Sequence, residues 1–158
     1  MKRIVFILLL FLAFTTGFAQ SYLGYGKTKA DYERVFGKFM KFYNNGQSDS
    51  IYSILSDKWN EENKRSNWNA DIIRIIQESI GKIESYKYID TFRGRIDAYS
   101  NPMVYFKLVF NKPAKSHVPS INNKKEHAVC LSLDEEGKIL GLNFITSSPA
   151  VDSLISKY

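Results

Sequence analysis

The chain contains a single cysteine, Cys130, which excludes an internal disulfide, so apolar packing must hold the core together. It also lacks a glycine-rich phosphate loop, a serine nucleophile elbow and any zinc-type spacing of cysteine and histidine. Cys130 and His127 are three residues apart and would lie on opposite faces of a strand, so they could not bind one ion together. The sequence therefore predicts neither a metal nor a cofactor.

The chain also lacks a large excess of charge of one sign. The formal net charge is +6, and +4 without Lys2 and Arg3, an excess too small to imply nucleic acid by itself. The lysine-rich stretch 112–125 contains no aromatic residue on which a base could stack, so no nucleic acid partner is predicted. The stretch could bind an anion or an acidic partner, or simply be solvated, through Lys112, Lys115, His117, Lys124 and Lys125.

Residues 1–19 have the pattern of a secretory signal peptide. Lys2 and Arg3 precede the short apolar run 4–14, and Gly17-Phe18-Ala19 has the small residues of a cleavage site. We expect cleavage before Gln20 and export to the periplasm or the medium, with no membrane contact afterwards. The alternative is an uncleaved anchor in the cell envelope, although Thr15-Thr16-Gly17 interrupts the apolar run before it could span a bilayer.

The 158 residues have the composition of one globular domain, with 44% hydrophobic and 24% charged residues. Residues 20–27, with two glycines and two tyrosines, are expected to be a flexible leader. The domain itself is predicted over residues 28–146, followed by a tail over residues 147–158.

The domain is predicted to begin with two amphipathic helices separated by Asn44-Asn45-Gly46. Thr28 can cap the first helix, with Asp31 completing a capping box. Ser48 or Asp49 can cap the second. Apolar residues recur at helical spacing in both: Tyr32, Val35, Phe36, Phe39, Met40 and Tyr43 in the first, and Ile51, Ile54, Leu55 and Trp59 in the second.

A third helix is predicted after the charged stretch 61–65, which has no apolar stripe and is expected to be a solvated connector. Asn67 or Asn69 would cap this helix, and Gly81 would end it. Its apolar residues are Trp68, Ile72, Ile73, Ile76 and Ile80.

From residue 82 onward the apolar period changes to two, which is typical of strands. Residues 82–99 could form one long bent strand with a bulge at Gly94. In the next strand Val104, Phe106, Leu108 and Phe110 share one face, and Met103, Tyr105, Lys107 and Val109 share the other. Strands over 127–134 and 138–145 form a hairpin.

Helices followed by strands predict an α+β fold, in which three N-terminal helices pack on one face of a curved antiparallel sheet of about four strands. The helix break at 42–46, the helix end Ile80-Gly81-Lys82-Ile83 and the hairpin 133–142 resemble the cone-shaped nuclear transport factor 2-like superfamily. Within it, the chain is similar to small exported bacterial domains of unknown function. That superfamily includes isomerase-like and dehydratase-like enzymes as well as binding and dimerising modules, so the resemblance does not decide the function.

The resemblance implies where each kind of function would reside. An isomerase or lyase would need a pocket carboxylate, for which Asp97 is the candidate, although Arg95 beside it would favour the weakly basic ionised form. Trp59 and Trp68 could line the mouth of a ligand pocket or close the end of the core. A homodimer would use the outer sheet face, with Met103, Tyr105 and Val109 as apolar contacts. We favour an exported non-enzymatic domain that binds an unknown small molecule or protein.

Overall fold

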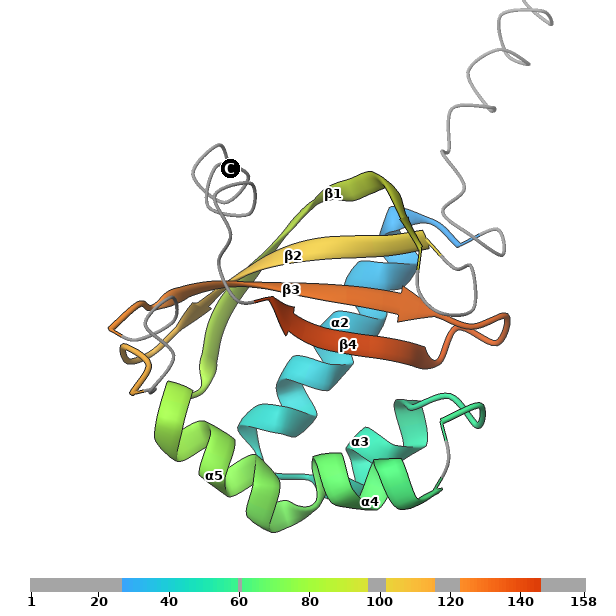
Figure 1. Ribbon diagram of the computed structural model, residues 1–158. Helices are drawn as coiled ribbons and strands as arrows, with labels where there is room; N and C mark the ends of the chain where they lie inside the picture. The colour runs from blue at the N-terminus through green and yellow to red at the C-terminus, as the bar shows by residue number, and fades with distance from the viewer. Residues whose placement is uncertain (1–26, 60, 97–101, 116–122, 146–158) are drawn as a thin grey trace, which may run out of the picture.

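The computed structural model describes residues 27–59, 61–96, 102–115 and 123–145. Within them, four helices come first: α2 (Lys29–Asn44), α3 (Ser48–Ile54), α4 (Glu61–Trp68) and α5 (Ala70–Ile80). Four strands follow: β1 (Ile83–Ile96), β2 (Pro102–Phe110), β3 (Glu126–Leu133) and β4 (Ile139–Ile145). This order confirms the predicted α+β class (Figure 1). The predicted signal peptide and tail lie outside the described residues.

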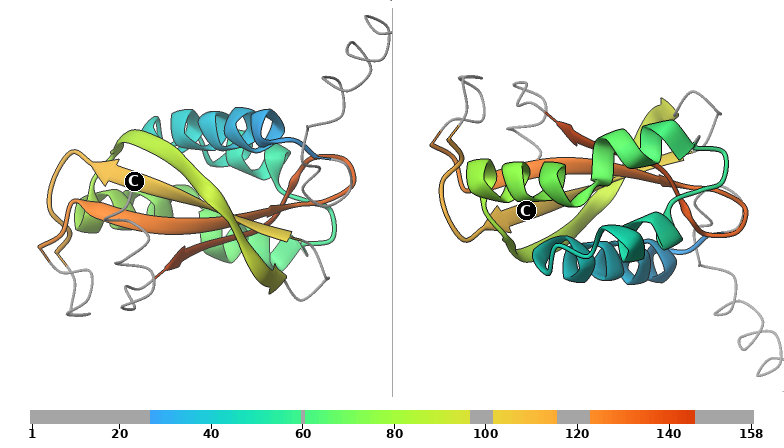
Figure 2. Two further views of the ribbon diagram at one scale, coloured as in Figure 1. Left: turned by 90° about the horizontal axis from the view of Figure 1, so that it is seen from above. Right: turned by 90° about the horizontal axis from the view of Figure 1, so that it is seen from below.

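The strands form one antiparallel sheet in the order β1-β2-β3-β4, so each strand pairs with the next along the chain. The sheet is twisted, and the described helices lie together against one of its faces (Figure 2). None of these helices is both long enough and apolar enough to cross a bilayer.

Helix α2 begins and ends where the sequence predicts. Thr28 Oγ1 accepts a hydrogen bond from Asp31 N at 3.3 Å, and the Asp31 carboxylate accepts one from Thr28 N at 2.9 Å, which completes the capping box. The hydrogen bond from the Thr28 backbone lowers the pKa of Asp31 to about 2, so this cap stays charged near neutral pH. After Asn44 the chain reaches Gly46, whose φ of 66° ends the helix.

The predicted caps of the second helix are wrong. Helix α3 starts at Ser48 after Gln47, and no side chain caps its start. The tight turn from α2 satisfies the first backbone groups instead, because Gln47 N donates to Phe42 O at 2.9 Å and Ser48 N to Gly46 O at 3.2 Å. A capping side chain is therefore not needed here.

Helix α3 is also shorter than predicted, and Trp59 lies beyond it. The helix ends at Ile54 because the backbone then pairs with the edge strand β4. Leu55 forms a parallel bridge with Ile139, and Ser56 N donates to Ile139 O at 2.8 Å. This pairing attaches the helical layer to the edge of the sheet.

The stretch 61–65, predicted to be a connector, forms the first part of helix α4. Its buried face consists of Lys64 and Trp68, which are four residues apart and each 5% exposed. A lysine and a tryptophan do not make an apolar stripe, which is why the periodicity misses this helix. The sequence predicted Trp68 near the start of the next helix. In the structure Trp68 is instead the last residue of α4.

Helix α5 starts and stops as predicted. Asn69 Oδ1 accepts a hydrogen bond from Ile72 N at 2.9 Å, which caps the first turn. Gly81 follows the last turn with a φ of 91°, and Ile73 is the fully buried residue of the helix.

The predicted strands are confirmed with small shifts of their ends. Strand β1 is one long strand, and its pairing with β2 changes register between Thr91 and Ile96, a span that includes Gly94. The β3–β4 hairpin turns at Gly137, whose φ is 81°. On β2, four alternating side chains are fully buried against the helices: Val104, Phe106, Leu108 and Phe110.

Aromatic rings fill the space between the helices and the sheet. Phe36 of α2 stacks on Phe106 of β2, with ring centroids 4.5 Å apart and planes 13° from parallel. Tyr86 and Tyr88 of β1 meet the Phe106 ring edge-on at 5.8 and 5.6 Å. Phe106 thus joins the first helix to two strands.

Replacing Phe106 with Ala should lower the free energy of unfolding by about 3–5 kcal/mol, because it leaves a cavity where α2 and two strands meet. Ile75→Ala serves as the control, since Ile75 is 49% exposed and should change stability by no more than about 0.5 kcal/mol. Urea unfolding measures both. Equal losses in the two variants would contradict this description of the core.

Candidate functional site

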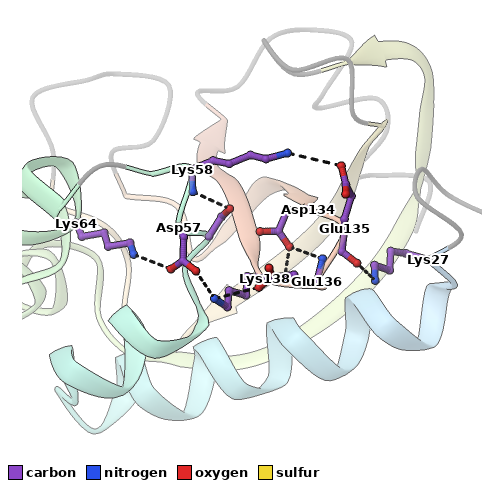
Figure 3. A network of polar contacts seen from close by, with 9 residues as sticks. Lys27, Asp57, Lys58, Lys64, Asp134, Glu135, Glu136 and Lys138 are labelled. Atoms are coloured by element: carbon purple, nitrogen blue, oxygen red, sulfur yellow. Dashed lines mark hydrogen bonds and ion pairs between the residues drawn. The ribbon is translucent and has the colours of Figure 1, made fainter.

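A charged network ties the β3–β4 turn to the segment that follows α3, and we name it the clasp. It consists of Lys27, Asp57, Lys58, Lys64, Asp134, Glu135, Glu136 and Lys138 (Figure 3). At its centre, Asp134 Oδ1 accepts hydrogen bonds from Glu136 N at 3.0 Å and Lys138 N at 2.9 Å. Asp134 is only 5% exposed, so this carboxylate fixes the turn from the inside.

Asp57 lies between two cations of the clasp. Lys138 Nζ donates to Asp57 Oδ2 at 2.7 Å, and Lys64 Nζ lies 3.6 Å from Asp57 Oδ1 (Figure 3). The Lys64 side chain is 6% exposed, whereas that of Asp57 is 76% exposed. Asp57 therefore supplies a negative charge to a lysine that is otherwise buried in α4.

The outer part of the clasp binds the turn to its neighbours. Lys58 Nζ lies 3.8 Å from Glu135 Oε1, and Lys27 Nζ donates to the Glu135 backbone carbonyl at 2.7 Å. Lys138 Nζ also lies 3.2 Å from Glu136 Oε2. These contacts join the start of α2, the end of α3 and the hairpin.

The electrostatics of the clasp favour fully charged groups. The hydrogen bond from Lys138, with the charge of its ammonium group, lowers the pKa of Asp57. The hydrogen bonds to Asp57 and Glu136 raise the pKa of Lys138. A general acid or base needs a pKa near the working pH, so these shifts go in the wrong direction for proton transfer.

The clasp also encloses little space. A shallow pocket of about 100 Å³ lies among Ser56, Asp57, Lys58, Asp134, Glu135 and Glu136. In the part of the chain that the structure describes, no three His, Cys, Asp or Glu side chains are placed to hold a metal ion. The arrangement therefore suits the joining of segments better than binding or catalysis.

The far end of the sheet gathers lysines, and we name it the basic end: Lys82, Lys112, Lys115, Lys124 and Lys125. Backbone hydrogen bonds hold its segments together: Asn111 N to Lys82 O, Lys115 N to Ser79 O, Ala114 N to Lys124 O and Phe110 N to Lys125 O, all between 2.7 and 3.0 Å. His127 Nε2 lies 3.1 Å from Lys124 O, and burial lowers the pKa of this histidine. A neutral ring with its proton on Nε2 can donate this hydrogen bond.

A surface pocket of about 270 Å³ opens at the basic end, beside the last turn of α5. Its lining residues are Arg74, Gln77, Glu78, Gly81, Lys82, Asn111 and Lys112. Gly81 is required here twice over, because its φ is positive and a Cβ would collide with Asn111 Oδ1. Asn111 Oδ1 in turn accepts a hydrogen bond from Lys82 N at 3.0 Å. Gly81 and Asn111 therefore have fixed positions in the pocket, and the cations in its lining are Arg74, Lys82 and Lys112.

The two tryptophans proposed as a pocket mouth pack against the core. Trp68 is 5% exposed, and its ring meets Phe39 edge-on at 5.1 Å. Its Nε1 is buried without a hydrogen-bond partner among the described residues. Trp59 is partly buried against the same cluster. Neither lines the pockets of the clasp or the basic end.

The three residues proposed for a dimer interface differ in exposure. The predicted alternation on β2 is confirmed, because Tyr105 pairs with Cys130 on the face that points away from the helices. Tyr105 is nevertheless only 1% exposed and packs with Ile89 and Cys130. Met103 and Val109 are partly exposed. The expectation that Tyr105 contacts a second copy is therefore corrected, because this side chain is already buried within its own chain.

Asp97, the candidate base, lies outside the described residues, as does His117 of the basic stretch. The predicted separation of His127 and Cys130 is confirmed. His127 pairs with Leu108 on the core face, whereas Cys130 pairs with Tyr105 on the outer face.

Sequence reasoning missed the clasp and found most of the basic end. Asp134 before Glu135-Glu136-Gly137 was a readable signal, since an aspartate often bonds the backbone of the turn that follows it. No pattern in the sequence indicates that Lys64 pairs with Asp57, because this pairing depends on how α4 packs against the end of α3.

No protein-family model, curated protein or solved structure matches the chain. The function is therefore inferred from the site and the fold alone.

Asp134→Ala should reduce the free energy of unfolding by about 1–3 kcal/mol, because it leaves two turn amides without their acceptor. Asp134→Asn keeps an oxygen at the same place and should lose clearly less. Urea unfolding of the two variants gives the comparison. If Asn is as costly as Ala, the acceptor role assigned to this carboxylate is wrong.

Asp57→Asn should destabilise the protein at neutral pH, by an amount that shrinks in acid. The folded state lowers the pKa of Asp57 below its ordinary 3.8, so its ionised form adds stability above that pH and loses this contribution as the pH falls. Glu84→Gln is the control, since Glu84 is exposed and forms no ion pair with the described residues. Thermal unfolding from pH 7 to pH 3 tests this, and a pH-independent difference would contradict it.

Proposed function

We propose that this chain is an exported, non-enzymatic interaction domain with a nuclear transport factor 2-like cone, and that it binds its partner on its outer surface. The observation that carries the proposal is the close packing of aromatic rings between the described helices and strands. Phe36, Phe39 and Phe106 are all fully buried; the Phe36 ring stacks on that of Phe106 and lies tilted against that of Phe39, with centroids 5.8 Å apart. An enzyme of the isomerase type needs a cavity with a carboxylate in that space.

The polar groups near the core also favour this proposal. Tyr43 is buried and donates a hydrogen bond to Gly81 O at 2.7 Å, and burial raises the pKa of its hydroxyl group. Asp134 and Lys64 are held within the clasp. Each of these groups has a structural partner, and none faces the pocket of the basic end.

A homodimer through the outer sheet face is a weaker form of the same proposal. With Tyr105 buried in its own chain, Met103 and Val109 are the predicted contacts that retain exposed surface. A stable interface buries roughly 800 Å² on each partner, far more than two partly covered side chains provide. We therefore propose a different protein as the partner.

The enzyme alternative depends on Asp97, and the envelope alternative depends on an uncleaved residue 1–19 segment. Asp97 and residues 1–19 lie outside the described residues. One measurement distinguishes both alternatives from the proposal. That measurement is the intact mass of the exported protein, purified from its native host and sprayed first under native and then under denaturing conditions.

We expect the mass of a chain that begins at Gln20, with no small molecule bound in stoichiometric amount under native conditions. A retained signal segment would support the envelope alternative. A small molecule that is released on unfolding, and that is absent from Asp97→Asn protein prepared in the same way, would overturn the proposal in favour of the enzyme. The Glu84→Gln variant is the matched control for the loss of one carboxylate.

A further inference from the structure

The basic end brings together five lysines, and two of them, Lys82 and Lys115, have no counter-ion among the described residues. The nearby carboxylates are already engaged, because Glu78 pairs with Arg74 at 3.0 Å and Glu126 pairs with Lys107 at 3.0 Å. Lys82 and Lys115 are exposed, and their ammonium groups form no hydrogen bond or ion pair with the described residues.

A purely structural role explains only part of this cluster. Cations near the end of a helix are stabilised by its dipole, and Lys112 Nζ donates to Glu78 O in the last turn of α5 at 2.7 Å. The Lys115 backbone, not its side chain, bonds to Ser79 O. The ammonium groups of Lys82 and Lys115 are therefore not needed to complete the helix end.

Exposed apolar surface occurs at the same end. Among the described residues, the large hydrophobic side chains that stay exposed are Ile75 on α5, at 49%, and Phe144 on β4, at 37%. Ile75 follows Arg74, which lines the cationic pocket. The Phe144 ring lies 6.3 Å from that of Phe110, whose backbone N–H donates to Lys125 O. In Figure 1, α5 ends on the left, where β3 begins, and β4 runs toward this side and ends nearer the middle of the sheet.

We propose that the basic end is the docking surface for an acidic, partly apolar segment of a partner protein. This inference rests on the proposed interaction function and names its surface and the chemistry of the partner. Lysine ammonium groups are compact charges that suit separate carboxylates, and the pocket of about 270 Å³ has room for a side chain between Lys82 and Lys112. Ile75 and Phe144 supply apolar contact beside these charges.

Charge and shape favour a protein segment over a lipid surface or a nucleic acid. Membrane-bound surfaces insert a continuous apolar face, whereas Ile75 and Phe144 are at least half covered and lie on separate elements. Single-stranded nucleic acids need aromatic rings for stacking, and none occurs among residues 111–115 or 123–125.

The test uses the full exported chain and a fluorescent helical peptide built from Glu and Leu, with fluorescence anisotropy as the readout. Lys82→Gln combined with Lys115→Gln should weaken binding roughly tenfold, which corresponds to about 1.4 kcal/mol for the loss of two exposed ion pairs. The matched control is Lys29→Gln combined with Lys38→Gln, which removes the same charge from two exposed lysines of α2, outside the basic end and outside the clasp. The control should change binding less than twofold.

Four results would overturn the inference. One is an equal loss of binding in both pairs of variants, which would indicate general charge attraction. Another is equal binding of a peptide with Gln in place of every Glu. The third is binding to phosphatidylglycerol vesicles without binding to the peptide, which would indicate a lipid surface. If the peptide fails while the native mass shows no bound small molecule, the docking surface is wrong and the proposed interaction function still stands.

Discussion

The contact between α2 and β2 determines the rest of the arrangement. When Phe36 stacks on Phe106, the apolar side of the first helix is fixed across the middle of the sheet. The turn at Gly46 then directs α3 toward the far edge, where Leu55 pairs with Ile139 of the last strand. One aromatic contact and one backbone bridge thus connect the first helices to both the centre and the edge of the sheet, and the clasp can form only because this bridge brings Asp57 beside Lys138.

The features that the sequence predicted are those with local causes. The capping box at Thr28, the stop at Gly81 and the alternation on β2 each depend on residues within a few positions of one another. The predictions are wrong where contacts between segments distant in the sequence determine the local structure. Helix α3 ends early because of a bond to a strand far along the chain, and α4 forms although its buried face pairs a lysine with a tryptophan. Most lysines of the basic end could be found in the sequence, and so could the turn at Asp134, whereas the ion pairs of the clasp depend on tertiary contacts that no spacing encodes.

The outer face of the sheet shows a second limit of pattern reasoning. Alternation correctly assigns Tyr105 to the face that points away from the helices, but it does not say whether that face is covered. Tyr105 packs with Ile89 and Cys130 and loses nearly all its exposed surface. A residue on the outer side of a sheet is therefore not automatically available to a partner, and in this protein the exposed lysines of the basic end and the exposed ring of Phe144 lie near the ends of the strands.

The two ends of β3 differ in how their charges are used. At the clasp, the side chains of Lys58, Lys64 and Lys138 pair with those of Asp57, Glu135 and Glu136, and these ion pairs join the segments. Lys27 and Asp134 bond to the backbone of the turn. At the basic end the carboxylates are fewer than the lysines, and Lys82 and Lys115 extend into solvent. Paired charges gain little from a further ligand, whereas unpaired charges beside exposed apolar side chains gain both electrostatic and hydrophobic contact. Among the described residues, aromatic rings pack between the helices and the sheet, so the proposed partner would find its charged and apolar contacts together at the basic end.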